Sequence, residues 1–173
     1  GRGSAASGDG IYEAVAAGQT WVNRGRDGAG RRGRIRVHPT NPDVVFACAS
    51  GRMTAPQQER GVFRTTDGGE HWERVLFVDA DTGCSGLSMD AKNPRTIWAG
   101  TWQVEMHPWA MLSGGPGSGV YVSRDGGSKW TKSEAAGLPT PPPANIDLAV
   151  APPRSPPLSP LLPPTAPATV PHP

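Results

Sequence analysis

One twelve-residue pattern occurs twice in the chain and constrains its fold more than any other feature. The copies span residues 61–72, GVFRTTDGGEHW, and residues 119–130, GVYVSRDGGSKW. Each has a glycine followed by two apolar residues, a hydroxyl residue two positions before an aspartate, then Gly-Gly, and a tryptophan. A third copy over residues 10–21 is incomplete, because Ala16 stands where the other two have the aspartate.

The centre of this pattern predicts a β-hairpin. Two short apolar runs flank Asp-Gly-Gly, which is a strong hairpin signal. The aspartate can accept hydrogen bonds from backbone N–H groups two or three residues later, and the glycines can adopt positive φ. The tryptophan gives the returning strand an apolar anchor. We therefore interpret these residues as structural: Thr65, Asp67, Gly69 and Trp72 in one copy, and Ser123, Asp125, Gly127 and Trp130 in the other.

The spacing of the copies predicts β-propeller blades. The leading glycines Gly10, Gly61 and Gly119 recur every ~50–60 residues, a period that suits four antiparallel strands. We expect an all-β chain of about two and a half blades from a larger ring, because closure usually takes about four to eight blades. We expect a loose end at 1–9, a partial propeller at 10–151 and a disordered Pro-rich tail at 152–173. Within the propeller we expect a partial blade at 10–33, blades at 34–77 and 85–132, and the start of another blade at 145–151.

Composition and charge indicate which classes of partner are disfavoured. The net charge is +2 and 18% of residues are charged, which does not favour a nucleic-acid partner. We expect no membrane span in this stretch, since no apolar run approaches the ~20 residues a membrane helix needs. The two cysteines, Cys48 and Cys84, fall in different predicted strands. The favoured interpretation is two small buried thiols, with a disulfide as the alternative.

The pattern Ser/Thr-x-Asp-x-Gly-x-x-Trp resembles the Asp-box, or BNR, repeat of sialidases, xyloglucanases, the sortilin family and a photosystem II assembly propeller. The preceding segments 34–42 and 86–94 also share a common pattern that ends in Asn-Pro. Over roughly residues 8–151 the chain looks most like the bacterial sortilin-like, "BNR-repeat glycosyl hydrolase" group. This resemblance implies a propeller that is secreted, periplasmic or at the cell surface.

Loop lengths predict the face that carries any site. The loops at 50–60 and 103–118 are longer than the turns beside the Asp-Gly-Gly sequences, and long loops on a rigid scaffold carry binding residues. Any site is therefore expected on the face opposite those turns. The candidate ligand-binding residues are Glu59, Arg60, Trp102, Glu105, His107 and Trp109. Two alternatives remain: a self-packed loop with Trp109 as its plug, and an ion pair of Glu59 and Arg60 between blades.

No catalytic residue, metal site or cofactor is predicted. Glycoside hydrolysis normally needs two placed carboxylates, and nothing in the sequence pairs Glu59, Asp79, Asp81 or Glu105. The spacing of Asp79 and Asp81 is calcium-like but lacks the terminal glutamate of a calcium loop. The resemblance therefore favours a non-catalytic, sortilin-like binding propeller for an extracellular protein, peptide or glycan. The alternative is part of a glycoside hydrolase whose catalytic carboxylates lie partly in other blades.

Overall fold

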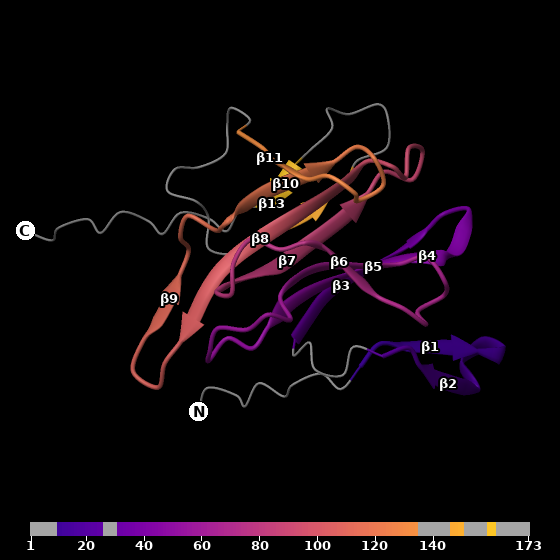
Figure 1. Ribbon diagram of the computed structural model, residues 1–173, viewed down its shortest axis with the longest axis horizontal. Coiled ribbons are helices and arrows are strands. Elements are labelled where there is room, and N and C mark those ends of the chain that lie inside the picture. The colour runs from indigo at the N-terminus through magenta and orange to yellow at the C-terminus, as the bar shows by residue number, and fades with distance from the viewer. Residues whose placement is uncertain (1–9, 26–30, 135–145, 151–158, 162–173) are drawn as a thin grey trace, which may run out of the picture.

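The computed structural model describes residues 10–25, 31–134, 146–150 and 159–161, and these form antiparallel strands almost throughout (Figure 1). The first unit is a hairpin of β1 (Tyr12–Val15) and β2 (Thr20–Asn23), joined by the short 3-10 helix η1 (Ala16–Gly18). This is the incomplete copy of the pattern. Without the aspartate its turn is built differently, and Ala17 has a φ of 56°, a value that non-glycine residues seldom adopt.

The first complete blade contains four strands in consecutive order, each antiparallel to its neighbour. The sequence predicted a blade at 34–77, and its four strands are present. Their observed bounds are β3 (Arg31–His38), β4 (Asn41–Gly51), β5 (Gly61–Thr65) and β6 (Glu73–Leu76).

The second complete blade repeats this order with one addition. Its strands are β7 (Thr82–Met89), β8 (Ile97–Met106), β10 (Gly119–Ser123) and β11 (Thr131–Lys132). The sequence predicted a long loop at 103–118. Instead β8 continues to Met106 and pairs with an unpredicted strand, β9 (Met111–Ser113), so that part of this expected loop is a hairpin.

A further sheet pairs β12 (Asp147–Ala149) with β13 (Ser159–Leu161). The strand expected near 145–150 is therefore present as β12. Within the tail that was predicted to be disordered, Ser159–Leu161 form an antiparallel ladder with β12. The remaining tail residues and the loose end at 1–9 lie outside the described residues.

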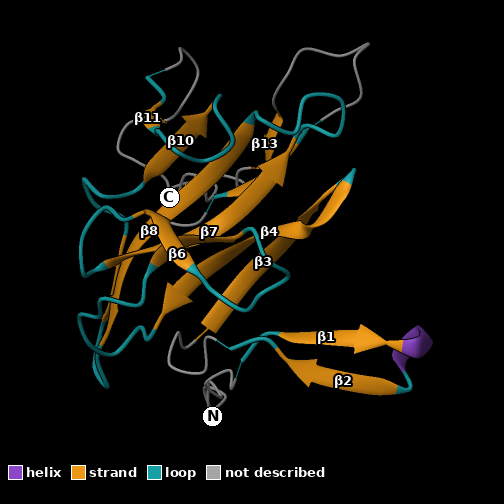
Figure 2. Ribbon diagram, turned by 45° about the vertical axis from the view of Figure 1, so that its right-hand side comes forward, coloured by secondary structure: helices purple, strands orange, loops and turns teal. Residues whose placement is uncertain are grey.

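The two complete blades pack face to face, and their contact forms the main hydrophobic core (Figure 2). The first blade contributes apolar side chains of β4, β5 and β6, and the second contributes those of β7 and β8. The buried members are Phe46, Cys48, Val62, Leu76, Cys84, Leu87, Ile97 and Ala99.

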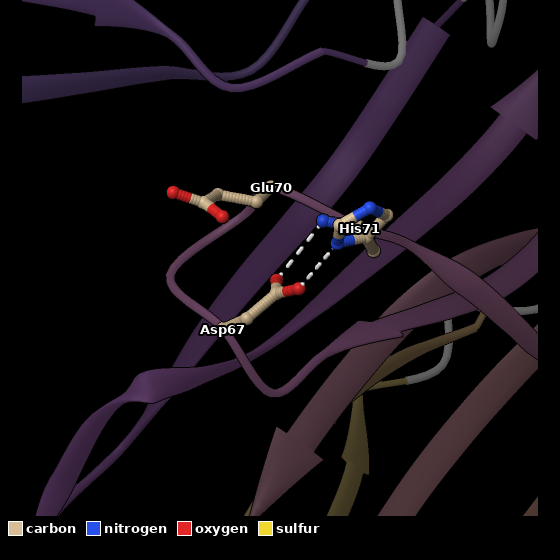
Figure 3. A group of neighbouring side chains, drawn as sticks. All are labelled: Asp67, Glu70 and His71. Carbon is tan, nitrogen blue, oxygen red and sulfur yellow. Dashed lines mark hydrogen bonds and ion pairs between the residues drawn. The ribbon is translucent and has the colours of Figure 1, made fainter.

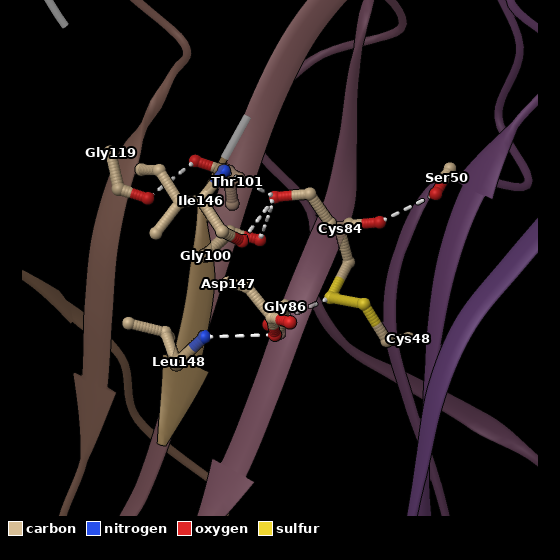
Figure 4. Close-up of a disulfide and its surroundings, with 11 residues drawn as sticks. Cys48, Ser50, Cys84, Gly86, Gly100, Thr101, Gly119, Ile146, Asp147 and Leu148 are labelled. Carbon is tan, nitrogen blue, oxygen red and sulfur yellow. Dashed lines mark hydrogen bonds between the residues drawn. A yellow bond between two sulfur atoms is a disulfide. The ribbon is translucent and has the colours of Figure 1, made fainter. Parts of the chain in front are cut away.

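A disulfide between Cys48 and Cys84 crosses this core (Figure 4). The favoured interpretation of two free buried thiols is wrong. Cys48 lies on β4 and Cys84 on β7, and the packing of the blades brings their Cα atoms to 5.2 Å, within the range that a disulfide spans. Beside it, Ser50 Oγ donates a hydrogen bond of 2.8 Å to the carbonyl of Cys84.

The connections lie at two ends of the blades, as their lengths predict. At one end the short turns touch one another: Gly68 N donates to the carbonyl of Asp43, and Gly126 N to that of Arg95. At the other end the long loops meet, and Met106 N donates to the carbonyl of Met53. In the described part of the chain, no helix is long and apolar enough to cross a membrane.

Candidate functional site

The Asp67 carboxylate holds its turn together through local hydrogen bonds (Figure 3). Oδ1 accepts from the Thr65 hydroxyl at 2.7 Å and from the His71 backbone N–H at 2.9 Å. The Thr65 hydroxyl oxygen accepts from Gly69 N at 2.9 Å. The backbone contact of Asp67 is thus four residues downstream, one further than predicted, and Gly68 and Gly69 both adopt positive φ within the turn.

The Asp125 turn repeats these hydrogen bonds and adds one backbone donor, which lies three residues downstream as predicted. Asp125 Oδ1 accepts from the Ser123 hydroxyl at 2.8 Å and from the backbone N–H groups of Ser128 and Lys129 at 3.0 Å. Gly127 N donates to the Ser123 hydroxyl oxygen at 2.8 Å. Both carboxylates therefore act on their own turns.

These bonds lower the pKa of both aspartates. The largest cause is the backbone N–H of His71 for Asp67 and that of Lys129 for Asp125, each of which favours the ionised carboxylate. A carboxyl group whose folded pKa lies below its unfolded value of about 3.9 stabilises the fold above that pH. The stabilisation disappears as the pH falls from about 4 toward the lower folded value.

We therefore expect the Asp67→Asn variant to lose less stability than the wild type as the pH falls into the acidic range. The wild-type melting temperature should fall more steeply than that of the variant as the pH decreases below about 4, because the amide cannot take up the proton. Thermal melts between neutral and acidic pH measure this. Equal slopes for the two proteins would contradict the assigned role of the carboxylate.

One group near this turn was not predicted from sequence. Asp67, Glu70 and His71 place their metal-ligating atoms within 4.8 Å of one another, and all three residues are exposed (Figure 3). Asp67 Oδ2 lies 2.7 Å from His71 Nδ1, so the carboxylate is already engaged by its own turn. An open hollow of about 540 Å³ adjoins Glu70, lined by Asn23, Arg24, Gly25, Gly69, Glu70 and Trp72.

At the opposite end, strands β8 and β9 form a hairpin that projects from the second blade (Figure 1). Residues 103–113, the outer part of β8 together with β9 and the turn between them, are called the arm here. His107 N donates to the carbonyl of Ala110 at 2.7 Å and closes its turn. Trp109 lies in that turn and is 81% exposed, so the alternative in which it plugs a self-packed loop is wrong.

Three predicted residues meet on the arm. The rings of His107 and Trp109 are stacked, with centroids 5.4 Å apart and an interplanar angle of 7°. Glu105 Oε1 lies 3.1 Å from His107 Nε2. The arrangement presents a flat indole beside an imidazole and a carboxylate, a combination that stacks on ring faces and accepts or donates hydrogen bonds at their edges.

The other predicted tryptophan, Trp102, supports the base of the arm. Trp102 is partly buried, and its Nε1 donates to Ser113 Oγ at 3.0 Å, which ties β8 to β9. The arm also exposes apolar side chains that the sequence analysis did not select, namely Met106, Met111 and Leu112. These side chains are exposed because β8 extends beyond the blade, and both faces of a projecting hairpin meet solvent.

Arg60 does not face the solvent. It is 1% exposed, and its guanidinium donates to the carbonyls of Asp81 at 2.5 Å and Ala55 at 3.2 Å, and to that of Arg52. The structure therefore gives Arg60 a structural role instead of the predicted ligand contact. It links the two blades through backbone carbonyls. Glu59 itself is partly buried.

Acidic residues surround this arginine. Burial lowers the pKa of Arg60, while the carboxylates of Asp81, Asp79 and Glu105 act in the opposite direction. Asp81 N donates to Asp79 Oδ1 at 2.9 Å, so the sequence that resembles a calcium loop forms a local turn. The carboxylates of this face therefore have a buried cation as their shared neighbour.

No family model matches the chain, and no curated protein matches its sequence. Solved structures do match. An ancestral GH74 enzyme superposes with a TM-score of 0.58 at 18% identity over 84% of this chain. A GH74 enzyme of Niastella koreensis gives 0.56 at 14% identity over 82%. The GH74 xyloglucanase of Xanthomonas campestris gives 0.44, a score too low to support an argument.

The chain has a propeller-blade fold. The first two matches cover 18% and 19% of the solved chains, so this chain spans less than a fifth of their length. That share agrees with about two and a half blades of a larger assembly. The matched proteins are GH74 enzymes, whereas the similarity to the sortilin-like group remains a resemblance in sequence motifs.

Proposed function

We propose that these blades belong to a glycoside hydrolase propeller and bind glycan on the face that carries the arm. The observation that carries this proposal is the exposed indole of Trp109, stacked on His107 with Glu105 beside it. The likeness to GH74 enzymes supports the class of ligand. Sugar rings present apolar faces and hydroxyl edges, which suit an aromatic plane flanked by polar groups.

The stack leaves one face of Trp109 for a ligand, because His107 covers the other. Glu105 lies on β8 and His107 directly follows the end of that strand, and Glu105 Oε1 lies 3.1 Å from His107 Nε2. Their contact fixes the imidazole under the indole. The ligand would then meet a ring already held in place, which reduces the entropy lost on binding.

A second function, a non-catalytic binding propeller, is favoured by the arm itself: an exposed indole stacked on an imidazole can bind the face of a sugar ring without a catalytic pair of carboxylates. Under either proposal the glycan contact is the arm, and any catalytic pair would involve other blades.

Trp109→Ala is expected to weaken glycan binding by about 5- to 150-fold, since loss of a stacking aromatic removes on the order of 1–3 kcal/mol. Its melting temperature should hardly change, because the ring is 81% exposed. The measurement is calorimetry of the full-length protein with a panel of neutral and anionic polysaccharides. Asp67→Ala is the matched control and should lower the melting temperature while leaving affinity intact.

Release of reducing ends from the same polysaccharides separates the two functions. Hydrolysis by the full-length protein supports the glycoside hydrolase, and binding without hydrolysis supports the binding propeller. Unchanged affinity in Trp109→Ala would contradict the glycan site itself. The buried Cys48–Cys84 disulfide supports a further proposal, that the protein works in an oxidising compartment as a secreted, periplasmic or cell-surface protein.

A further inference from the structure

Three of the four methionines of the chain lie next to one another where the arm meets the first blade. Met106 on β8 stands opposite Met111 on β9 in their antiparallel ladder. Met106 N also donates to the carbonyl of Met53 at 2.7 Å, and Met53 belongs to the long loop of the first blade. The fourth methionine, Met89, lies on β7 and packs against the main core.

The methionine pair on the arm is exposed, although methionine is among the residue types most often buried. Met106 is 37% exposed and Met111 is 49% exposed, while Met53 is partly buried. Residues directly opposite each other in an antiparallel ladder share a face and have Cβ atoms about 4.5–5.5 Å apart. The thioethers of Met106 and Met111 therefore project to the same side of the arm.

Met53 brings a third thioether to the other edge of β8. A backbone N–H points to one edge of a strand only, and that of Met106 points to Met53, so β9 and Met53 flank Met106 on opposite sides. Methionine is unbranched, has three rotatable bonds and carries a polarisable sulfur. Side chains of this kind on neighbouring positions can bring their sulfur atoms to one point.

Thioether sulfur is a soft, uncharged ligand that suits copper(I) better than harder ions. Both cysteines are joined in the buried disulfide, so methionine supplies the accessible sulfur of this chain. The arm carries one carboxylate, that of Glu105, and neither lysine nor arginine, so no cationic side chain of the arm repels a bound cation. The imidazole of His107 is engaged by Trp109 and Glu105, which leaves the thioethers as the ligand set.

We propose that Met53, Met106 and Met111 form a binding site for a soft monovalent cation, copper(I) or silver(I), with their three sulfur atoms as ligands. The ion joins the long loop of the first blade to the arm of the second blade. This inference rests on the strand register and on the contact between the blades, and it is independent of the glycan proposal.

The test labels the full chain isotopically at the methionine methyl groups and titrates it with silver nitrate in a chloride-free buffer. The methyl signals of Met53, Met106 and Met111 in the NMR spectrum should shift together, while that of Met89 should stay, because Met89 packs against the core. Replacement of each methionine by leucine in turn assigns the four signals. Excess zinc(II), which binds nitrogen, thiolate and carboxylate ligands, should not reverse the shifts.

Calorimetry with silver nitrate provides the second measurement. Met106→Leu/Met111→Leu should weaken silver binding at least about tenfold, since even the outer-shell partners of a metal contribute about 10–100-fold to its affinity. Leucine and methionine are similar in volume, so the fold should be retained. Met89→Leu is the matched control and should bind silver like the wild type. The proposal is overturned if any of the three signals fails to shift, if zinc displaces the silver, or if the double variant keeps the wild-type affinity.

Discussion

Arg60→Ala is expected to lower the free energy of unfolding by about 3–5 kcal/mol. The side chain is 1% exposed and donates to backbone carbonyls of two loops and of both blades. Its removal leaves those carbonyls buried without donors, at about 1–3 kcal/mol for each that water cannot reach. It also removes the cation that the neighbouring carboxylates Asp81, Asp79 and Glu105 share.

Urea denaturation of the full chain measures this effect. Arg60→Lys should fall between the wild type and the alanine variant, because an ammonium keeps the charge but cannot reproduce the planar spread of donors. Arg124→Ala is the matched control, since Arg124 is exposed next to Asp125 and surface substitutions usually stay within about 0.5 kcal/mol. If Arg60→Ala lowered the free energy of unfolding as little as this control does, the buried guanidinium would not hold the loops together.

Loss of the Cys48–Cys84 disulfide is expected to cost about 4 kcal/mol. The bond joins residues 36 positions apart, and closing a loop of that size removes much of the conformational freedom of the unfolded chain. It also connects the two blades at the centre of their shared core. The double variant Cys48→Ala/Cys84→Ala keeps two small apolar side chains there, so the change reports chiefly on the covalent bond.

Thermal melts with and without a reductant provide the comparison. Reductant should lower the melting temperature of the wild type toward that of the double variant, and it should leave the double variant unchanged. Both cysteines are 0% exposed, so reduction should become fast only when the blades open. A wild type that melts at the same temperature with and without complete reduction would contradict the stabilising role.

Local features of the molecule were readable from the sequence because their causes are local. The turn at Asp67 needs a carboxylate, a hydroxyl two residues earlier and glycines that accept positive φ, and all of these lie within six residues. The period of the leading glycines then predicted blades of four strands, and the alternation of short turns and long loops predicted which end of the blades carries the arm.

The contacts between blades were decided only by the tertiary structure. Whether Cys48 and Cys84 are thiols or a disulfide depends on how β4 packs on β7. The residue pattern within either strand does not specify the distance between the two cysteines. Arg60 reads as a surface residue at the end of a polar loop, yet carbonyls from distant segments enclose it.

In the arm, too, the sequence predicted one part and the tertiary structure decided the other. The residue types of Glu105, His107 and Trp109 marked a candidate site, but residues 103–118 were predicted to form a loop. The continuation of β8 and its pairing with β9 instead hold the three side chains on a projecting hairpin. Sequence determined the strands and turns, because local hydrogen bonds and side-chain periodicity specify them. The packing of separate strands determined which side chains became exposed, buried or bonded, since those outcomes depend on contacts between residues far apart in the chain.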